Sequence, residues 1–458
     1  MQTNRLLALL LGLSLLIAAC GDSEAEDGST ASDQAETEGA SGAGDSGDGE
    51  DTSDQADGAD DAAGNGEIDE SDLFSPTETD APLDLSGGAT SSDEGVVIEA
   101  DDPTTGLSGD LIQATAPWPT DWSRRTVDLG TLGLGIPSID PRDRIPPIDL
   151  PKFEPIADAT WLDDREPGAL VDFGGEIRFY PLSILTRHEI VNDRFGDVPI
   201  TVTYCPLCNT AIAFDARVDG QALRFGVSGL LRNSDLVMWD EGTTSLWQQI
   251  TGEAIAGEFA GTRLDFLPTS IVSYGDARDS FPDALSLSRA TGFDIPYGSN
   301  PYTGYSSTSQ PFLFSGELDD RFPALSRVVG VNTEDGRKAY PFQLIEPEGV
   351  VNDTIGDLPV AVFWGGDTAD ALDQSTIADS AAIGTGIAFD RRVGDQLLTF
   401  TTGGDDLFVD DETGTTWSLL GLGIDGPLAG ERLQVIDHRN EFWFAWAAFF
   451  PDASVYGG

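Results

Sequence analysis

TAIAFD at residues 210–215 recurs as TGIAFD at residues 385–390, an offset of 175 residues. Other matches flank this pair in the same order. They are Tyr180-Pro181 at an offset of 160 and Phe281-Pro282-Asp283-Ala284 at an offset of 169. Identities at near-constant spacing are typical of a tandem duplication. We therefore expect a first repeat over residues 155–321 and a second, degenerate repeat over residues 322–458.

Each repeat is expected to be rich in strands, with short helices. Gly174-Gly175 separates two strand-like runs, which is a β-hairpin signal. Gly and Pro recur too often for long helices. The sequence predicts an α+β, mainly β fold, with two tandem related subdomains from an internal duplication after a disordered acidic linker. The expected elements are strands at residues 169–173, 176–180, 199–204, 211–218, 222–228 and 236–240, a weak helix at 182–191 and a helix at 441–450.

Residues 1–20 form a predicted lipoprotein signal peptide. Arg5 precedes an apolar run at residues 6–17, which is too short to span a bilayer as a stable helix. The run ends in Ile17-Ala18-Ala19-Cys20-Gly21, which resembles the lipobox of bacterial lipoproteins. The resemblance implies that Cys20 is acylated and anchors the mature protein in the lipid bilayer, on the periplasmic or cell-surface side. An ordinary secretory signal is the alternative, and it also predicts an extracytoplasmic protein.

Residues 21–110 contain 28 Asp or Glu residues and no Lys or Arg. Such a segment buries too little apolar surface to fold, so we expect a disordered acidic linker. Residues 111–154 are expected to form an extended, Pro-rich lead-in that packs on the domain. Without the linker the chain still has a net charge near −29, which argues against nucleic acid as a partner.

Cys205-Pro206-Leu207-Cys208 holds the two cysteines that follow Cys20 in the chain. A thiol pair at this spacing favours thiol–disulfide exchange with an unknown thiol or disulfide partner, in which Cys205 attacks and Cys208 resolves. If a helical turn begins at Pro206, its backbone N–H groups lower the pKa of the Cys205 thiol. An inert disulfide is the structural alternative, but so short a ring stabilises a fold by only about 2 kcal/mol. This redox interpretation needs no cofactor.

His188 lies one predicted strand before Cys205 and is the candidate that tunes the thiolate or carries a proton. In an alternative interpretation, Cys205, Cys208 and His188 bind copper or zinc. Met238 and His438 are further candidate ligands. A third interpretation is a non-catalytic surface interaction scaffold. No thiol in the second repeat faces either cysteine, so we expect the site in the first repeat alone.

Several short stretches are spread over residues 141–310. They are residues 145–148, 161–167, 188–193, 203–208, 236–240, 245–247, 251–255, 288–292 and 300–302. Together they resemble the bacterial domain-of-unknown-function 3179 family. The family has no established activity, and the selenocysteine in the cysteine motif of some members fits redox chemistry. The resemblance also attaches Asn233, Trp247 and Gln248 to the surroundings of the motif, as candidate binding residues.

Overall fold

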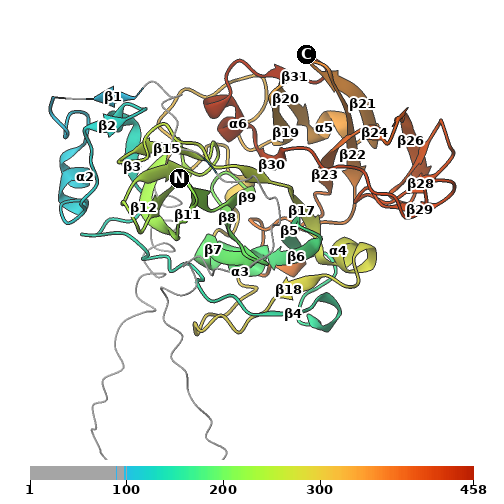
Figure 1. Ribbon diagram of the computed structural model, residues 1–458, viewed down its shortest axis with the longest axis horizontal. Coiled ribbons are helices and arrows are strands. Elements are labelled where there is room, and N and C mark those ends of the chain that lie inside the picture. The colour runs from blue at the N-terminus through green and yellow to red at the C-terminus, as the bar shows by residue number, and fades with distance from the viewer. Residues whose placement is uncertain (1–88, 90–96, 100) are drawn as a thin grey trace, which may run out of the picture.

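The structure is a computed structural model that describes Ala89, residues 97–99 and residues 101–458 (Figure 1). Cys20, the predicted signal peptide and most of the predicted linker lie outside these residues. The end of that linker is described, and it carries regular structure: β1 (Ile98–Glu99) pairs antiparallel with β2 (Arg124–Arg125). Helix α2 (Gly109–Ala114) then begins within the predicted linker. No helix of the described residues is long and apolar enough to cross a membrane.

Strands predominate in the described part of the chain and helices are few and short, which confirms the predicted α+β, mainly β class. The later helices are α3 (Leu182–His188), α4 (Tyr274–Ser280), α5 (Phe342–Ile345) and α6 (Trp443–Phe449), with 3₁₀ turns at Leu129–Thr131, Ile156–Asp158, Tyr305–Ser307 and Ile377–Asp379.

Three sheets and a short hairpin build the first half. One sheet has the order β17-β5-β6-β18-β4, a second β16-β9-β8-β7, and the third β1-β2-β15-β14-β13-β12-β3, while β10 and β11 form the hairpin. The bounds are β3 (Leu132–Leu134), β4 (Phe153–Pro155), β5 (Pro167–Phe173), β6 (Glu176–Pro181), β7 (Ile190–Phe195), β8 (Val198–Cys205), β9 (Thr210–Asp215), β10 (Arg217–Val218), β11 (Gln221–Ala222), β12 (Phe225–Arg232), β13 (Asp235–Asp240), β14 (Leu246–Gln248), β15 (Glu253–Ala256), β16 (Phe266–Leu267), β17 (Thr269–Ser273) and β18 (Leu285–Leu287).

The second half follows a similar order, with the sheets β30-β19-β20-β31, β21-β22-β23 and β26-β27-β28-β29 and the hairpin β24-β25. The bounds are β19 (Arg327–Thr333), β20 (Gly336–Pro341), β21 (Val350–Ile355), β22 (Leu358–Gly365), β23 (Thr385–Asp390), β24 (Arg392–Val393), β25 (Gln396–Leu397), β26 (Phe400–Gly404), β27 (Leu407–Asp410), β28 (Thr416–Trp417), β29 (Gly423–Asp425), β30 (His438–Phe442) and β31 (Ser454–Val455).

Two tight turns, one in each half, are built alike. Asp240 accepts hydrogen bonds from the backbone of Thr243 at 2.6 Å and from the indole of Trp247 at 3.0 Å. Asp410 accepts from the corresponding residues, at 2.6 Å from the backbone of Thr413 and at 2.9 Å from the indole of Trp417. The two turns therefore make matching contacts, one in each half.

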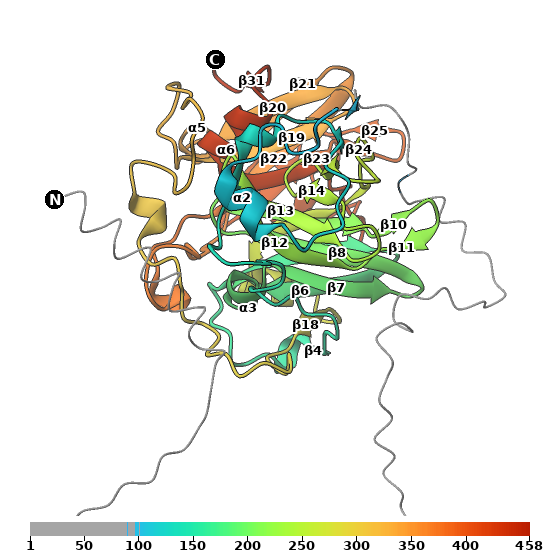
Figure 2. The same ribbon diagram turned by 90° about the vertical axis from the view of Figure 1, so that its left-hand side faces the viewer.

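The two halves share one apolar core. Strand β30 of the second half contacts β17 and β9 of the first. Trp443 and Trp446 of α6 are fully buried in the same cluster as Tyr204 and Cys208. Two perpendicular views show the second half, orange to red, lying against the first, green to yellow (Figures 1 and 2). The lead-in also packs on the first half, because Trp118 shares a cluster with strands β12 and β13.

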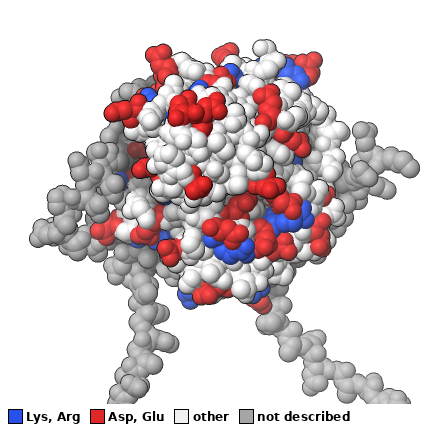
Figure 3. Space-filling view, turned by 90° about the vertical axis from the view of Figure 1, so that its right-hand side faces the viewer, with Lys and Arg blue, Asp and Glu red and all other residues white. Residues whose placement is uncertain are grey.

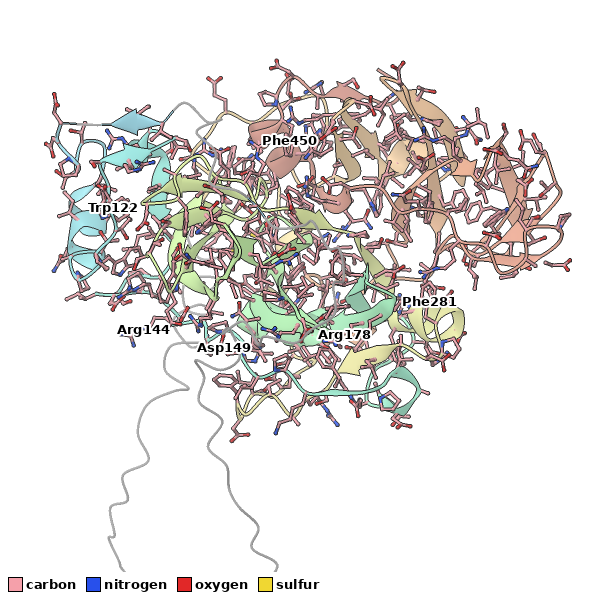
Figure 4. The ribbon with its side chains drawn as sticks, in the orientation of Figure 1. Trp122, Arg144, Asp149, Arg178, Phe281 and Phe450 are labelled. Atoms are coloured by element: carbon pink, nitrogen blue, oxygen red, sulfur yellow. The ribbon has the colours of Figure 1, made fainter. Side chains whose placement is uncertain are left out.

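Figure 4 traces the lead-in from Trp122, at one end of the molecule, past Arg144 and Asp149 toward β4. Asp149 and Asp143 both form ion pairs with Arg224, at 2.9 and 2.7 Å, and so fasten this segment to the first half. Elsewhere acidic side chains are more numerous than basic ones on the face shown in Figure 3, as the composition predicts.

Two predicted helices have different bounds in the structure. The helix predicted at residues 182–191 ends at His188, because Glu189 has a left-handed backbone (φ 59°) and residues 190–195 form β7. The helix predicted at residues 441–450 begins only at Trp443, because Glu441 and Phe442 still belong to β30. Its aromatic side chains face the core in part: Phe442 and Trp446 are fully buried, whereas Phe449 is half-buried.

Candidate functional site

The cysteine motif forms the turn between two antiparallel strands. Strand β8 ends at Cys205, which pairs with Thr210 at the start of β9. The turn is closed by the backbone N–H of Cys208, which donates to the Cys205 carbonyl at 3.2 Å. Asn209 then takes a left-handed backbone (φ 56°), a conformation that Asn tolerates. The helical turn predicted at Pro206 is absent, because the chain turns back at once into β9.

Both cysteines are free thiols buried beneath the surface. Cys205 is 2% exposed and Cys208 is fully buried. Burial raises the pKa of the Cys205 thiol, and the neighbouring Asp235 and Glu189 raise it further. Burial likewise raises the pKa of Cys208 well above its ordinary value. The prediction of a lowered thiol pKa was therefore wrong, since no helix terminus is present and the nearest charged groups are acidic.

Asp235 completes a cluster with the two thiols. The sulfur atoms of Cys205 and Cys208 and a carboxylate oxygen of Asp235 all lie within 4.8 Å of one another, and all three residues are buried. The carboxylate is held in place through Oδ2, which accepts from Gln248 Nε2 at 2.6 Å and from the backbone N–H of Ile250 at 3.0 Å. The other oxygen, Oδ1, is buried and has no hydrogen-bond partner.

Sequence reasoning missed Asp235, although a signal was present. It is the one charged residue at the head of an otherwise apolar run, Leu236-Val237-Met238-Trp239. All six residues of β13 are buried, so its first side chain cannot reach solvent. Burial raises the pKa of Asp235 to about 6, against the opposing hydrogen bonds from Ile250 and Gln248.

The three predicted binding residues lie in different environments. Gln248 contacts the site, because its amide donates to Asp235. Trp247 is a core residue instead: its ring packs edge-on against Phe225 and its N–H donates to Asp240. Asn233 is half-buried in the β12–β13 turn with a left-handed backbone (φ 52°). Of the three, only Gln248 has a direct contact with the thiol cluster.

His188 does not serve the thiols in this structure. Its Nδ1 lies 2.7 Å from the Pro146 carbonyl and its Nε2 lies 2.7 Å from the Tyr297 hydroxyl. Both ring nitrogens are thus engaged away from the cysteines. Burial lowers the pKa of His188 to about 4. The prediction that this histidine tunes the thiols or ligates a metal with them was wrong, because α3 ends here and directs the ring toward the lead-in and Tyr297.

The next residue, Glu189, takes the position beside the thiols. The backbone of Glu189 is left-handed, and its side chain lines the pocket that reaches Cys205, unlike that of His188. Glu189 Oε1 accepts a hydrogen bond of 3.3 Å from the Tyr302 hydroxyl. Burial raises the pKa of Glu189 to about 8, so the carboxyl is largely neutral at pH 7.

The other two candidate ligands have no hydrogen bond to the thiols among the described residues, although Met238 shares their core cluster. His438 is buried on β30, with Nδ1 at 2.9 Å from the Ile436 carbonyl and Nε2 at 3.4 Å from the Ser270 hydroxyl. Met238 is fully buried on β13. The group of the described residues that could hold a metal ion is Cys205, Cys208 and Asp235.

A pocket of about 60 Å³ reaches Cys205. Glu189 and Cys205 are its chemically active lining residues, and Cys208 does not line it. A β-bulge in β12 shapes one wall, because the pairing with β13 shifts between Val227 and Leu230. The remaining lining residues are Gly135, Ile136, Ile145, Pro206, Leu207, Gly229, Leu231, Leu236, Pro301, Tyr302, Phe312 and Leu313.

The second half holds the cysteine turn from behind. The backbone N–H of Phe442 donates to the Cys208 carbonyl at 3.0 Å, and the Asn209 amide donates to the Asn440 carbonyl at 3.1 Å. Glu441 from the same strand is fully buried, and burial raises its pKa to about 8. The site therefore belongs to the first half in sequence but depends on both halves in space.

A family model described as "Protein of unknown function (DUF3179)" matches residues 142–453. A comparison with curated proteins and one with solved structures found no match.

Proposed function

The chain belongs to the DUF3179 family, and from that membership and the geometry of the cysteine cluster we propose that it is a thiol–disulfide redox protein. Cys205 and Cys208 would cycle between two thiols and one disulfide, with the gain or loss of two electrons and two protons. The observation that supports the proposal best is the buried Asp235 carboxylate, one oxygen of which lies within 4.8 Å of both sulfur atoms. The carboxylate can accept the thiol proton. Such an acceptor is needed because the raised pKa of Cys205 keeps the thiol protonated at neutral pH.

The two cysteines have separate roles in this proposal. Cys205 attacks, because the pocket reaches it. Cys208 resolves, because it is fully buried and does not line the pocket. Asp235 accepts the proton of the attacking thiol, and its pKa of about 6 leaves it mostly ionised at neutral pH. A buried disulfide carries no charge, so the surroundings that disfavour two thiolates do not disfavour the oxidised state.

A redox titration of the full-length protein tests this function. Thiols are tagged by mass after equilibration in glutathione redox buffers of graded potential, with metal content measured on the same samples. We expect a reversible two-electron transition above about −250 mV, the range of labile functional disulfides. A much more negative potential would indicate a structural bond. Thiols that pair neither in these buffers nor with hydrogen peroxide would reject the proposal.

Two single variants test the division of roles. Cys208→Ser should trap a covalent adduct on Cys205, because the resolving thiol is gone. Cys205→Ser should leave Cys208 unmodified, because no pocket reaches it. Ser286→Ala, which removes a fully buried hydroxyl on β18 without a hydrogen-bond partner among the described residues, is the control. Equal labelling of the two single-cysteine proteins would contradict the assignment.

A metal site is the second candidate function, and the cluster of three ligand atoms favours it. Two thiolates with one carboxylate suit zinc better than Cu(I), which prefers soft ligands alone. Binding should require both cysteines, weaken in Asp235→Asn, and weaken at low pH as the ligands protonate. Glu258→Gln, an exposed acid, is the control. If both cysteines can be replaced with no change in any assay, the interaction scaffold becomes the better interpretation.

We also propose that the protein is exported and anchored in the membrane by acylation of Cys20, as the lipobox resemblance implies. Metabolic labelling with a fatty-acid analogue should mark the wild-type chain but not Cys20→Ala. Labelling that persists in the variant would reject the anchor. The internal duplication remains our inference as well, and the similar sheet order and the matching Asp240 and Asp410 turns support it.

A further inference from the structure

The pocket above Cys205 restricts what can reach the sulfur. Its volume of about 60 Å³ is room for about four water molecules, at 10–15 Å³ each. Its walls are mainly aliphatic, from β12, β13 and the lead-in. A thiol that exchanges with a protein disulfide must meet a sulfur atom at the surface, but Cys205 is only 2% exposed.

A segment over residues 300–314, here called the covering segment, closes the other side of the pocket. Two hydrogen bonds hold it on the cysteine turn and on the β12–β13 turn, and a third lies within the segment. The Tyr305 hydroxyl donates to the Leu207 carbonyl at 2.9 Å, the Phe312 backbone N–H donates to the Tyr305 hydroxyl at 3.4 Å, and the Ser234 hydroxyl donates to the Phe312 carbonyl at 2.6 Å. The cover is therefore a fixed part of the site.

Leu313 stands at the rim of the pocket. It is 45% exposed and has a left-handed backbone (φ 56°), which is uncommon for a bulky residue. Such a conformation persists where surrounding contacts enforce it, here the bonds of the covering segment. Leu313 is thus the side chain whose removal widens the opening with the least change to the core.

Charge restricts the pocket further. No Lys or Arg is among its lining residues, and its ionisable lining groups are Glu189, Cys205 and Tyr302. Asp235 lies just behind Cys205. An anion such as glutathione would lose its hydration without gaining a partner, and burial of an unpaired charge is costly. The reactant that fits is small and uncharged.

The limits on the size and charge of the reactant indicate which class of oxidant Cys205 meets. This step rests on the proposed redox function. We propose that Cys205 reacts with a small uncharged hydroperoxide, rather than with a protein disulfide or glutathione. The Cys205 sulfur attacks one peroxide oxygen and the O–O bond breaks. An alcohol, or water from hydrogen peroxide, leaves with one thiol proton, and Cys205 becomes a sulfenic acid.

Cys208 completes the reaction. Its sulfur attacks the Cys205 sulfur, the S–O bond breaks, and the hydroxyl leaves as water with the second thiol proton. The sum is two thiols and one hydroperoxide giving one disulfide, one alcohol and one water. The peroxide is reduced by two electrons and the thiol pair is oxidised by two.

The test compares the rate of disulfide formation in the reduced full-length protein with four oxidants at equal concentration. These are hydrogen peroxide, tert-butyl hydroperoxide, bis(2-hydroxyethyl) disulfide as a small uncharged disulfide, and oxidised glutathione. We expect both hydroperoxides to react at least about 100-fold faster than glutathione disulfide, a difference of about 2.7 kcal/mol in activation free energy. The small disulfide should also be slower than both hydroperoxides.

A substitution of Leu313, at the rim of the pocket, tests whether the rim excludes oxidised glutathione. Leu313→Gly should speed the reaction with oxidised glutathione by about tenfold or more and leave the hydrogen peroxide rate almost unchanged. Leu150→Gly removes another exposed leucine, 43% exposed, and should change neither rate. Thermal unfolding of both variants confirms that they are folded.

Each outcome has a distinct meaning. Oxidised glutathione as fast as hydrogen peroxide, or a small disulfide as fast, overturns the hydroperoxide assignment and leaves the redox function standing. Oxidation of Cys205 to sulfinic acid without a disulfide also overturns it, because Cys208 then fails to resolve. Thiols that no oxidant and no redox buffer converts would reject the redox function itself.

Discussion

At the scale of single residues, Asp235 has two opposing effects on the thiols. Its negative charge adds to burial in raising the pKa of Cys205, which reduces the thiolate present at neutral pH. One oxygen of the same carboxylate lies within 4.8 Å of both sulfur atoms, where it can act as a base. The first effect slows thiol chemistry and the second speeds it. A substitution that removes the charge but keeps the shape separates them.

We predict that Asp235→Asn lowers the pH at which Cys205 is alkylated by iodoacetamide, because a nearby negative charge is lost. We also predict that disulfide formation at pH 7 slows by about ten- to a hundredfold, because general base catalysis is lost. Alkylation across pH and quenched oxidation measure the two effects on the same protein. Glu258→Gln, far from the thiols in sequence and exposed, is the control. Faster oxidation in Asp235→Asn would show that thiolate content alone limits the rate.

The site could be predicted from the sequence only in part. The thiol pair was recognisable, because two cysteines at this spacing are rare in such a chain. The acidic partner was not, since Asp235 lies on β13, which belongs to a different sheet from the strands β8 and β9 that hold the thiols. His188 was predicted to carry a proton, a role that histidine serves near neutral pH, whereas Glu189 was not among the predicted site residues. In the structure Glu189, not His188, lies beside the thiols. Its backbone is left-handed (φ 59°), and a single sequence does not show that angle.

At the scale of elements, the β13–β14 and β27–β28 turns depend on one carboxylate each. Asp240 and Asp410 accept from backbone N–H groups and from a buried indole, Trp247 or Trp417. Removal of either carboxylate leaves these donors without partners inside the fold. Buried donors that lose a charged acceptor cost about 1.5–3 kcal/mol.

We predict that Asp240→Ala and Asp410→Ala each reduce the free energy of unfolding by about 3 kcal/mol, and by similar amounts. Urea unfolding followed by tryptophan fluorescence measures the loss in each variant separately, since the signal of the nine Trp residues reports on the whole fold. Asp128→Ala, which removes an exposed carboxylate that caps only the short Leu129–Thr131 turn, is the control. A large effect in one turn and none in the other would show that the two halves are held differently.

Local signals predicted strands better than they predicted where helices end. The hairpin at Gly174-Gly175 is present as β5 and β6, since the turn signal and the strand pattern agree. The C-terminal helix was predicted to begin at residue 441 but begins at Trp443. The polar residues of β30 that precede it resemble a helix N-terminus in sequence. His438, Arg439, Asn440 and Glu441 are all at most 5% exposed. Only the packing of the two halves explains why so polar a strand is buried.

At the scale of the whole molecule, the thiol cluster lies where the second half meets the first. Strand β30 bonds to the cysteine turn through Phe442 and Asn440. It also brings Glu441 toward the cluster, where this carboxyl contributes to raising the pKa of Cys208. A half without cysteines therefore shapes the electrostatics of the half that has them, which gives a reason for both to be kept in one chain.

Glu441 makes the stability of the assembled molecule depend on pH. Burial raises its pKa to about 8, and Asp235 and Asp437 add to this against the opposing charge of Arg439. The unfolded chain releases this proton near pH 4.5, whereas the folded chain keeps it until about pH 8. The folded state therefore binds more protons between these values, and its stability falls as pH rises through that window.

We predict that Glu441→Gln flattens this fall, because the amide keeps the shape of the neutral acid and cannot ionise. The free energy of unfolding, from urea titrations at pH 5, 7 and 9, should drop less in the variant, by up to about 4 kcal/mol between pH 5 and 9. Glu189 contributes a slope of the same sign, since burial also raises its pKa to about 8, so some dependence should remain. The exposed Glu241→Gln should follow the wild type. Parallel plots of the free energy of unfolding against pH for Glu441→Gln and the wild type would mean that Glu441 is already ionised or solvated in the folded protein. The second half would then not influence the thiols through this carboxyl.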